Sequence, residues 1–315
     1  MAHYLVTGGS GFIGSHIVDG LLAQGNQVRV LDNLSTGKKS NLAGVIDEID
    51  FIQGCITDSQ TVSQAMQGID YVFHQAALAS VPLSVERPLD THHHCVTGTV
   101  TVLNEARQAD VKRVIYAASS SAYGEQPHLA KVETDLPMPL SPYAAAKLAG
   151  EYYCQAFYHT YGLETVGLRY FNVFGPRQAP DSPYSAVIPL FVTQMLAGKK
   201  PTIYGDGQQS RDFTFIKNVI NANLTAATAE NVAGKIINIA NGKRITLLAL
   251  LRILNKQLRT DIDPIHAPPR AGDIIDSMAD NSLARKLLNY EVEVDIEEGL
   301  QRSVNYYRET TSSFE

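Results

Sequence analysis

The stretch TGGSGFIGSH, residues 7–16, stands between an apolar segment at residues 4–6 and a helix-like segment at residues 13–24. Gly8, Gly11 and Gly14 follow one another at three-residue spacing. Glycine allows a positive φ, lets backbone N–H groups approach a phosphate and lets a helix pack closely on a strand, while the helix N-terminus attracts negative charge. Taken alone, the stretch is consistent with a dinucleotide cradle or with a plain glycine-rich turn.

Asp32 favours the interpretation of this stretch as a dinucleotide cradle. It ends a second apolar run, residues 28–31, and lies about 20 residues beyond the glycines, where an acidic side chain can accept hydrogen bonds from an adenosine ribose. A carboxylate at this place would repel a 2′-phosphate. We therefore expect NAD rather than NADP.

The first half of the chain alternates between strand-like and helix-like segments. Candidate strands lie at residues 4–7, 27–32, 50–53, 71–75, 113–118 and 165–170. Candidate helices lie at residues 13–24, 59–66, 96–108 and 143–161. Because such alternation requires right-handed crossovers, it predicts an α/β fold with a Rossmann-type, doubly wound parallel sheet covered on both faces.

Beyond Asn172 the sequence is punctuated by proline and glycine, as in FGPRQAPDSPYS and YGDGQQSRDF. We expect residues 1–172 to form the dinucleotide-binding domain and residues 173–315 to form mainly a smaller, mixed α/β substrate lobe. Residues 235–240 resemble another strand, which we expect to return to the first domain, and residues 246–259 resemble an amphipathic helix.

Bulk properties exclude several function classes. The chain has 315 residues, 44% of them hydrophobic, and a formal net charge of −6 without a basic face for nucleic acid. No apolar run reaches the roughly 18 residues of a membrane helix, and no signal segment is evident, so we expect a cytoplasmic protein. Cys55, Cys95 and Cys154 fit neither a disulfide framework nor a metal motif, and we expect reduced thiols.

The segment SPYAAAK, residues 141–147, carries a second chemical signal. Tyr143 and Lys147 are four residues apart and share one helix face, which Ser141 and Pro142 can begin. A tyrosine with an ordinary pKa near 10 is too weak a base at neutral pH, but a neighbouring ammonium and the positive ring of NAD⁺ would stabilise its anion. The alternative is a solvated surface pair.

Hydroxyl groups follow the predicted strand at residues 113–118. Ser119, Ser120 and Ser121 stand at its carboxyl end, where ligands of open α/β sheets bind. A hydroxyl there can hold a substrate alcohol and pass on its proton.

These segments, taken in order with HQAA (74–77), SSSAYG (119–124) and LRYFNVFGPRQ (168–178), resemble the extended short-chain dehydrogenase/reductase family, and within it the nucleotide-sugar 4-epimerases. The resemblance implies that Tyr143 is the base, that Lys147 activates it and holds the nicotinamide ribose, and that Ser119 lies near O4 of the sugar with Ser121 as a second contact. The cofactor set it implies is Gly8, Gly11, Phe12, Ile13, Gly14, Asp32, Asn33, Ser35, Thr36, Gly37, Ile56, Gln75, Ala76, Ala77, Tyr143, Lys147 and Tyr170.

The resemblance also implies a site for a UDP-sugar. Arg211 in SRDF and Arg270 in PPRAGD match arginines that bind the pyrophosphate, where a planar guanidinium suits bidentate contact, although surface ion pairing is the alternative. Asp273 matches the acceptor for the uridine ribose. The whole implied substrate set is Ser80, Ser120, Asn172, Ala186, Val187, Tyr204, Arg211, Arg270, Asp273 and Ser277.

Two residues depart from the family pattern. Cys55 stands where relatives usually carry Asp near the adenine, and Cys95 stands where they usually carry Asn. Both changes weaken an expected cofactor hydrogen bond, and we expect neither residue to touch the chemistry. Residues 92–94 are three consecutive histidines whose side chains do not converge as ligands do, so we expect no metal site.

Two places in the sequence indicate which reaction is catalysed and which sugar is the substrate. Dehydratases of this family place Asp-Glu directly after the catalytic Thr, but here Ser120 and Ser121 occupy those positions, so the resemblance implies transient oxidation at C4 and reduction on the other face. Ser277 falls where some epimerases carry a bulky Tyr beside C2, so an N-acetyl group has room. We expect a UDP-GlcNAc/UDP-GalNAc 4-epimerase. The alternatives are a UDP-glucose/UDP-galactose 4-epimerase, a UDP-uronate (UDP-GlcA or UDP-GlcNAcA) 4-epimerase, a UDP-glucuronate decarboxylase, and an NAD-sensing scaffold without activity.

The helices at residues 96–108 and 143–161 carry apolar and aromatic residues on more than one face. In relatives the two corresponding helices form a four-helix bundle between subunits. The resemblance therefore implies a homodimer.

Overall fold

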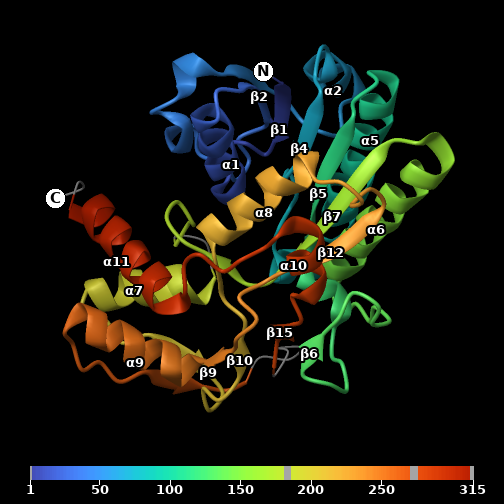
Figure 1. The fold of residues 1–315 in the computed structure, drawn as a ribbon. Coiled ribbons are helices and arrows are strands. Elements are labelled where there is room, and N and C mark those ends of the chain that lie inside the picture. Colours follow the sequence, from blue (N-terminus) through green and yellow to red (C-terminus); the bar gives the residue numbers. More distant parts are fainter. Residues whose placement is uncertain (1, 181–185, 270–275, 313–315) are drawn as a thin grey trace.

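Seven parallel strands form the central sheet of the computed structural model, which describes residues 2–180, 186–269 and 276–312 (Figure 1). Their order across the sheet is β12–β7–β5–β4–β1–β2–β3. The strands are β1 (His3–Thr7), β2 (Gln27–Asp32), β3 (Asp50–Gln53), β4 (Tyr71–His74), β5 (Arg113–Ser119), β7 (Glu164–Tyr170) and β12 (Lys235–Ile239). The chain builds outward from β1 to β3, then returns to β4 and builds in the other direction, which is the doubly wound order predicted from the sequence.

The reversal of direction falls between β1 and β4. Thr7, the last residue of β1, lies opposite Leu31 of β2 and His74 of β4. In open α/β sheets, ligands bind beyond the carboxyl ends of the strands at such a switch point. The glycine-rich stretch that follows Thr7 therefore lies where a ligand is expected.

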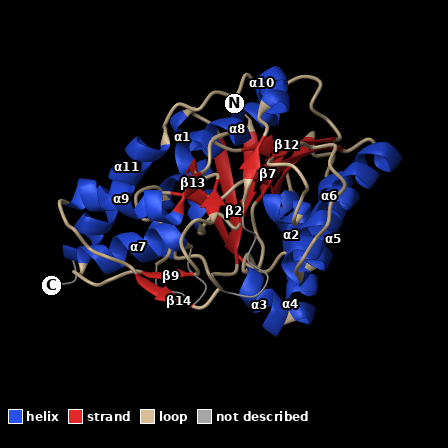
Figure 2. Cartoon of the chain, turned by 90° about the horizontal axis from the view of Figure 1, so that it is seen from below, coloured by secondary structure: helices blue, strands red, loops and turns tan. Residues whose placement is uncertain are grey.

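Helices cover both faces of the sheet (Figure 2). On one face lie α1 (Phe12–Ala23) and α8 (Ile216–Thr228), and on the other lie α2 (Ser59–Met66), α5 (Gly98–Gln108) and α6 (Pro142–Tyr161). Side chains along β1 alternate accordingly, since Tyr4 and Val6 pack on the first face and Leu5 on the second. Two short helices, α3 (Val81–Glu86) and α4 (Pro88–His92), and a π-helical turn at His93–Thr97 lead into α5.

A second group of elements lies beyond the carboxyl ends of the strands. Its helices are α7 (Val187–Leu196), α9 (Leu247–Leu258) and α11 (Ile296–Ser312), whereas α10 (Ser282–Leu288) packs against β12 and α8. Its strand pairs are β8 (Val173–Phe174) with β11 (Thr214–Phe215), β9 (Thr202–Tyr204) with β14 (Ile265–Ala267), β10 (Ser210–Arg211) with β13 (Ile245–Thr246), and β6 (Ala130–Lys131) with β15 (Met278–Ala279).

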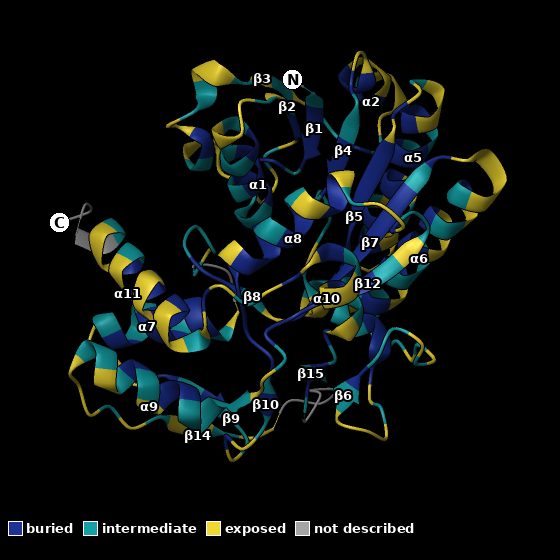
Figure 3. Cartoon of the chain, viewed as in Figure 1, coloured by how far each residue is buried: buried dark blue, intermediate teal, exposed yellow. Residues whose placement is uncertain are grey.

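This second group does not have a core of its own. Leu250, Leu254 and Leu300 belong to the same buried cluster as Ile17 and Val18 of α1. Figure 3 shows the burial, with dark strands at the centre and exposed residues on the outer sides of α9 and α11. The chain also returns to the sheet after entering the second group, because α8 packs against α1 and β12 pairs with β7.

The α/β fold class and the doubly wound sheet expected from the sequence are confirmed. Short 3₁₀ turns at Lys39–Leu42, Ile46–Glu48 and Ser120–Tyr123 were not predicted. None of the helices in the described ranges combines the length and the apolar character needed to cross a membrane.

Candidate active site

The glycine-rich stretch forms a tight backbone cradle between β1 and α1. Gly8 has a φ of +70°, and a Cβ added there would lie 2.7 Å from the backbone nitrogen of Ala76 at the end of β4. A Cβ on Gly14 would lie 2.2 Å from the carbonyl oxygen of Gly8. Larger residues are therefore excluded at both positions, for backbone conformation at Gly8 and for helix-to-strand packing at Gly14.

This cradle suits the diphosphate of a dinucleotide. Gly11 precedes α1 and offers no side-chain cap, so the N–H groups of the first turn are left for an anion. The Ser10 side chain is buried, and within the described residues its hydroxyl has no hydrogen-bond partner. A buried, unsatisfied hydroxyl beside uncapped backbone N–H groups is the donor set that a phosphate requires.

Asp32 lies at the carboxyl end of β2 and is 7% exposed. Its Oδ2 accepts the backbone N–H of Ser10 at 2.9 Å, and its Oδ1 accepts that of Leu34 at 2.7 Å. These bonds fix the carboxylate and leave lone pairs for ribose hydroxyls. Gly37 packs against the same carboxylate, since a Cβ there would lie 3.0 Å from Oδ2.

Cys55 has polar neighbours. The Sγ atom of Cys55 lies 3.1 Å from Oγ1 of Thr57, and Nδ2 of Asn33 donates to it at 3.8 Å. Nδ1 of His94 lies 3.9 Å from the same sulfur. Oδ1 of Asn33 also accepts the backbone N–H of Ser35. Ile56, which follows Cys55, is buried and packs against Gly98.

His74, to which we assigned no role from the sequence, is buried at the carboxyl end of β4. Nδ1 of His74 lies 2.8 Å from Oγ1 of Thr7, and Nε2 lies 3.0 Å from Oγ1 of Thr99. Because Thr99 donates its own proton to the carbonyl of Cys95, Nε2 of His74 carries the hydrogen and Nδ1 accepts from Thr7. Burial lowers the pKa of His74 to about 3, so the ring is neutral at physiological pH.

A second buried polar group joins the sheet to α8. The Tyr170 hydroxyl donates to Oδ1 of Asn223 at 2.8 Å, and Nε2 of Gln75 donates to the same hydroxyl at 3.2 Å. Gln75 and Tyr170 were expected at the cofactor, whereas Asn223 was not singled out. It lies on a helix far along the chain, and its sequence context gave no signal.

Ser119, Ser121 and Tyr143 form a chain of hydroxyls at the carboxyl end of β5. The Ser121 Oγ donates to the Ser119 Oγ at 2.8 Å, and Ser119 in turn is hydrogen-bonded to the Tyr143 side chain. The Ser119 Oγ also accepts the backbone N–H of Ser121, which fixes its position. Tyr143 enters this arrangement from the first turn of α6, whose N-terminus is capped by Ser141.

Lys147 lies one turn further along α6 and is only 4% exposed. Its Nζ donates to the carbonyl of Ala117 at 2.8 Å and lies 5.0 Å from the centre of the Tyr116 ring. A surface pair in water is therefore the wrong interpretation of Tyr143 and Lys147. Burial lowers the pKa of Lys147 from its ordinary value, and the neighbouring Cys95, Cys154 and Glu151 side chains act in the opposite direction.

Burial raises the pKa of Tyr143 to about 12, with Cys95 the next cause and the Ser119 hydrogen bond opposing both. The phenol is therefore neutral at pH 7 until a positive charge is placed beside it. Cys95 is buried, and the π-helical turn that contains it packs against α6.

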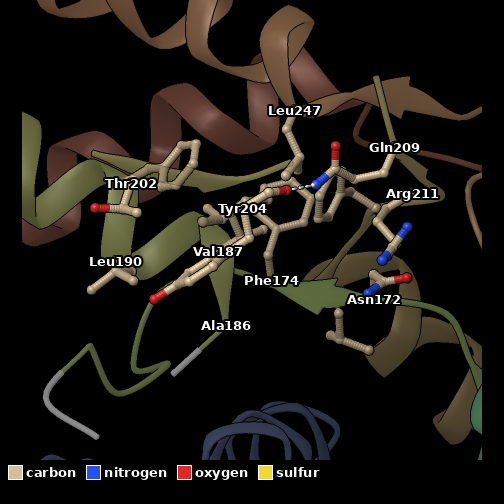
Figure 4. Close-up of a pocket in the computed structure, with 14 residues that line it drawn as sticks. Asn172, Phe174, Ala186, Val187, Leu190, Thr202, Tyr204, Gln209, Arg211 and Leu247 are labelled. Atoms are coloured by element: carbon tan, nitrogen blue, oxygen red, sulfur yellow. Dashed lines mark hydrogen bonds between the residues drawn. The ribbon is translucent and has the colours of Figure 1, made fainter. Parts of the chain in front are cut away.

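A cavity of about 250 Å³ lies on the far side of the site, in the second group of elements (Figure 4). Five of the residues expected to bind substrate line it: Asn172, Ala186, Val187, Tyr204 and Arg211. Phe174, Phe191 and Leu247 complete an apolar wall, and Nε2 of Gln209 donates to the carbonyl of Tyr204 at 2.6 Å. Sequence reasoning missed these four residues, three of them because apolar residues of a wall look like core residues.

Ser277 lies beside Arg211. Both the backbone N–H of Ser277, at 3.2 Å, and Nη1 of Arg211, at 2.9 Å, donate to the carbonyl of Ser210. The Ser277 side chain is small and buried. Directly before it, the Asp276 carboxylate accepts hydrogen bonds from Ser210 and Arg244.

The buried carboxylate of Asp212 ties this region together. It accepts the backbone N–H groups of Asn241, Gly242 and Ala279. Burial raises its pKa to about 7, although the three hydrogen bonds act in the opposite direction.

Of the remaining residues expected at the site, most lie within the described ranges and two lie outside them. Phe12 and Ile13 begin α1, Ala76 and Ala77 follow β4, Thr36 lies in the loop after β2, and Ser120 begins the 3₁₀ turn after β5. The Ser80 hydroxyl accepts the N–H of Leu83 and caps α3. Arg270 and Asp273 lie outside the described residues.

Comparison with known proteins gives a consistent result over nearly the whole chain. The model of the NAD dependent epimerase/dehydratase family matches residues 4–240. A solved UDP-N-acetylglucosamine 4-epimerase from Methanobrevibacter ruminantium M1, in complex with UDP-N-acetylmuramic acid, is similar at a TM-score of 0.94 and 41% identity, covering 98% of this chain and 99% of that one.

Two curated relatives are similar over comparable lengths. The UDP-glucose 4-epimerase of Mycolicibacterium smegmatis is 36% identical, covering 96% of this chain and 98% of the relative. The UDP-glucuronate 4-epimerase of Thermodesulfobacterium geofontis is 34% identical, covering 98% of this chain and 97% of the relative.

Proposed function

This chain belongs to the NAD-dependent epimerase/dehydratase family, and on that premise we propose that it interconverts UDP-GlcNAc and UDP-GalNAc by inverting the configuration at C4. It is an epimerase, and its cofactor is NAD. We assign cofactor binding to the cradle of residues 8–14, to Asp32 and to the ends of β4 and β7. We assign UDP-sugar binding mainly to the elements after residue 172.

The observation that carries the reaction class is the set of side chains beside Tyr143. Residues 119–124, SSSAYG, present hydroxyls and no carboxyl group. Elimination of water from a keto sugar needs a general acid and a base in addition to the tyrosine, and the residues after Ser119 supply neither. Transient oxidation and reduction need only one group to take and return a proton, which favours epimerisation over dehydration.

The protein side of the reaction follows from the contacts. NAD, when bound, accepts and returns the hydride and places a positive charge near Tyr143, which lowers the pKa of the phenol. Tyr143 then takes the proton of the sugar O4 hydroxyl, and it returns that proton after the 4-keto sugar has presented its other face. Ser119 holds O4 and hydrogen-bonds Tyr143, while Ser121 fixes Ser119. Lys147 is held by Ala117 at a position from which it can stabilise the tyrosine anion.

Ser277 supports the acetylated sugar. Its small side chain lies next to Arg211, which we assign to the diphosphate, and it leaves more room for a C2 substituent than a tyrosine would. The similarity to an enzyme that acts on UDP-GlcNAc points the same way. This chain is also similar to a UDP-glucose 4-epimerase and to a UDP-glucuronate 4-epimerase, so UDP-glucose and UDP-glucuronate are the alternative substrates.

The decisive experiment offers the purified enzyme a panel of UDP-sugars and identifies the products by NMR. We expect UDP-GlcNAc to give UDP-GalNAc, and no free NADH to accumulate. Conversion of UDP-glucose with none of UDP-GlcNAc would refute the proposed sugar. Release of CO₂ from UDP-glucuronate would indicate a decarboxylase, and no turnover of any sugar would favour an NAD-sensing scaffold.

We also propose that the enzyme is a homodimer. Leu89 of α4 is 83% exposed, and Val85 of α3 and Tyr152 of α6 are 64% and 55% exposed, along a face shared by adjoining helices. An apolar face of this kind is typical of a subunit interface. Light scattering on the eluted protein should give twice the 34.4 kDa chain mass, and a monomer at micromolar concentration would contradict the proposal.

A further inference from the structure

A buried lysine outside the catalytic group lies at the boundary between the sheet and the second group of elements. Lys131, on β6, is 3% exposed. Its Nζ donates to the backbone carbonyl of Asp276 at 3.1 Å, and within the described residues no carboxylate forms an ion pair with it. An ammonium group has three N–H donors, so two of them have no partner there.

Such a group is expensive to bury. Charged side chains that are fully removed from water are normally paired or bound to a ligand, because an uncompensated charge costs several kcal/mol. The nearby Asp276 carboxylate compensates only in part, since Arg244 lies 2.7 Å from it and Ser210 also donates to it. Lys131 accordingly has a lowered pKa, first from burial and then from the positive charge of Arg211, with Asp276 and Asp135 acting in the opposite direction.

Lys131 is also close to the residues that we assign to the substrate. The carbonyl that it binds belongs to Asp276, and the next residue along the chain is Ser277. Ser277 and Arg211 both donate to the carbonyl of Ser210. Lys131 and Arg211 are therefore two cationic side chains that are linked through the Ser210–Ser277 contact.

We propose that Lys131 is a specificity-determining residue that binds, together with Arg211, an oxyanion of the sugar nucleotide. This inference rests on the proposed function of the site. Two groups have that chemistry: a non-bridging oxygen of the diphosphate, and a carboxylate carried by the hexose. In either case the anion supplies the two hydrogen bonds and the paired opposite charge that the described residues do not provide.

Three substitutions separate charge from shape. Lys131→Met keeps the length and removes both the charge and the donor, Lys131→Gln keeps a donor for the Asp276 carbonyl without the charge, and Lys131→Arg keeps the charge. Lys235→Met, an exposed lysine at the start of β12, is the matched control. Affinity for UDP is measured by calorimetry on the NAD-containing enzyme, and kcat/KM is measured with UDP-GlcNAc and with its C6-carboxylate analogue.

Loss of a charge-assisted hydrogen bond predicts a roughly 10-fold or larger effect in the Met and Gln variants, and a smaller one in the Arg variant. Weaker binding of UDP itself assigns the anion to the diphosphate. Unchanged UDP binding with a selective fall in kcat/KM for the carboxylated sugar assigns it to the hexose.

Two results would overturn the proposal. If Lys131→Gln restores what Lys131→Met loses, the lysine only positions the Asp276 carbonyl. If no variant changes UDP affinity or the ratio between the two sugars, Lys131 binds no substrate anion. The UDP measurement does not depend on turnover, so a failure of the proposed epimerase activity would be seen separately in the wild-type assay.

Discussion

The cofactor end and the substrate end of the site are built in different ways. At the cofactor end, Gly8, Gly14 and Asp32 belong to one β–α–β unit, and each has backbone partners within that unit or on the adjoining strand β4. At the substrate end, Lys131, Arg211 and Ser277 come from three distant segments and meet through backbone carbonyls. Function at the first end therefore depends on local conformation, whereas function at the second depends on tertiary contacts.

This difference predicts where substitutions act. Changes at the cofactor end should affect the reaction of every sugar equally. Changes at the substrate end should alter the choice of sugar or the pH dependence, and leave the chemical step intact.

The largest expected effect is at Tyr143, which we place between the cofactor and the sugar. Tyr143→Phe removes the proton acceptor, and kcat should fall about 10²- to 10⁴-fold with every UDP-sugar that the enzyme accepts. Steady-state rates with saturating sugar measure this, and Tyr161→Phe, an exposed tyrosine at the end of the same helix, is the control. Full turnover by the Phe variant would remove Tyr143 from the mechanism.

Gly14→Ala should disturb the cofactor end. The new Cβ would lie 2.2 Å from the carbonyl oxygen of Gly8, so α1 must move away from β1 at a cost of about 1–3 kcal/mol or more. We expect a lower free energy of unfolding and less NAD retained after purification, measured by denaturant titration and by absorbance of the released cofactor. Gly44→Ala, where the added atom meets nothing within 4 Å, should change neither. Normal NAD content in Gly14→Ala would contradict the cradle.

Ser277→Tyr should lower activity with acetylated sugars selectively and leave cofactor binding unchanged. A tyrosine ring beside C2 would overlap an acetamide, and overpacking of about 1–3 kcal/mol corresponds to a roughly 5- to 150-fold loss for acetylated sugars relative to plain ones. The measurement is the ratio of kcat/KM for UDP-GlcNAc and UDP-glucose. Ser282→Tyr, at an exposed position on α10, serves as control. An unchanged ratio would refute the role of Ser277.

The smallest effect is a change in the pH dependence of stability at Asp212. Its pKa is 3.8 ordinarily and about 7 when folded, so between these values the folded state binds the extra proton. The stability contributed by that proton is complete below about pH 4 and is lost as the pH rises to about 7, with a slope of at most about 1.4 kcal/mol per pH unit.

Asp212→Asn should remove this slope. Free energies of unfolding measured from about pH 5 to about pH 8 should fall less steeply in the variant than in the wild type. Asp261→Asn, an exposed aspartate, should retain the wild-type slope. Parallel curves for Asp212→Asn would show that the three backbone hydrogen bonds outweigh burial and keep the carboxylate charged.

The same contrast explains how far the sequence could predict the structure. The strands of the sheet and the cradle were predictable because their signals are local: alternation of apolar segments, glycine spacing and a terminal aspartate. His74 and Asn223 were not assigned, since their partners Thr99 and Tyr170 are distant in sequence. Lys131 was not assigned, because nothing in its neighbours indicates that β15 will pair with β6.

The pairing of β12 with β7 has a consequence for synthesis on the ribosome. β7 is complete at Tyr170, but the strand that covers its outer edge is not made until residues 235–239. During that interval the nascent chain carries an uncovered parallel edge, which is a template for pairing with other chains. Co-translational folding of the sheet therefore ends only after much of the substrate end has emerged.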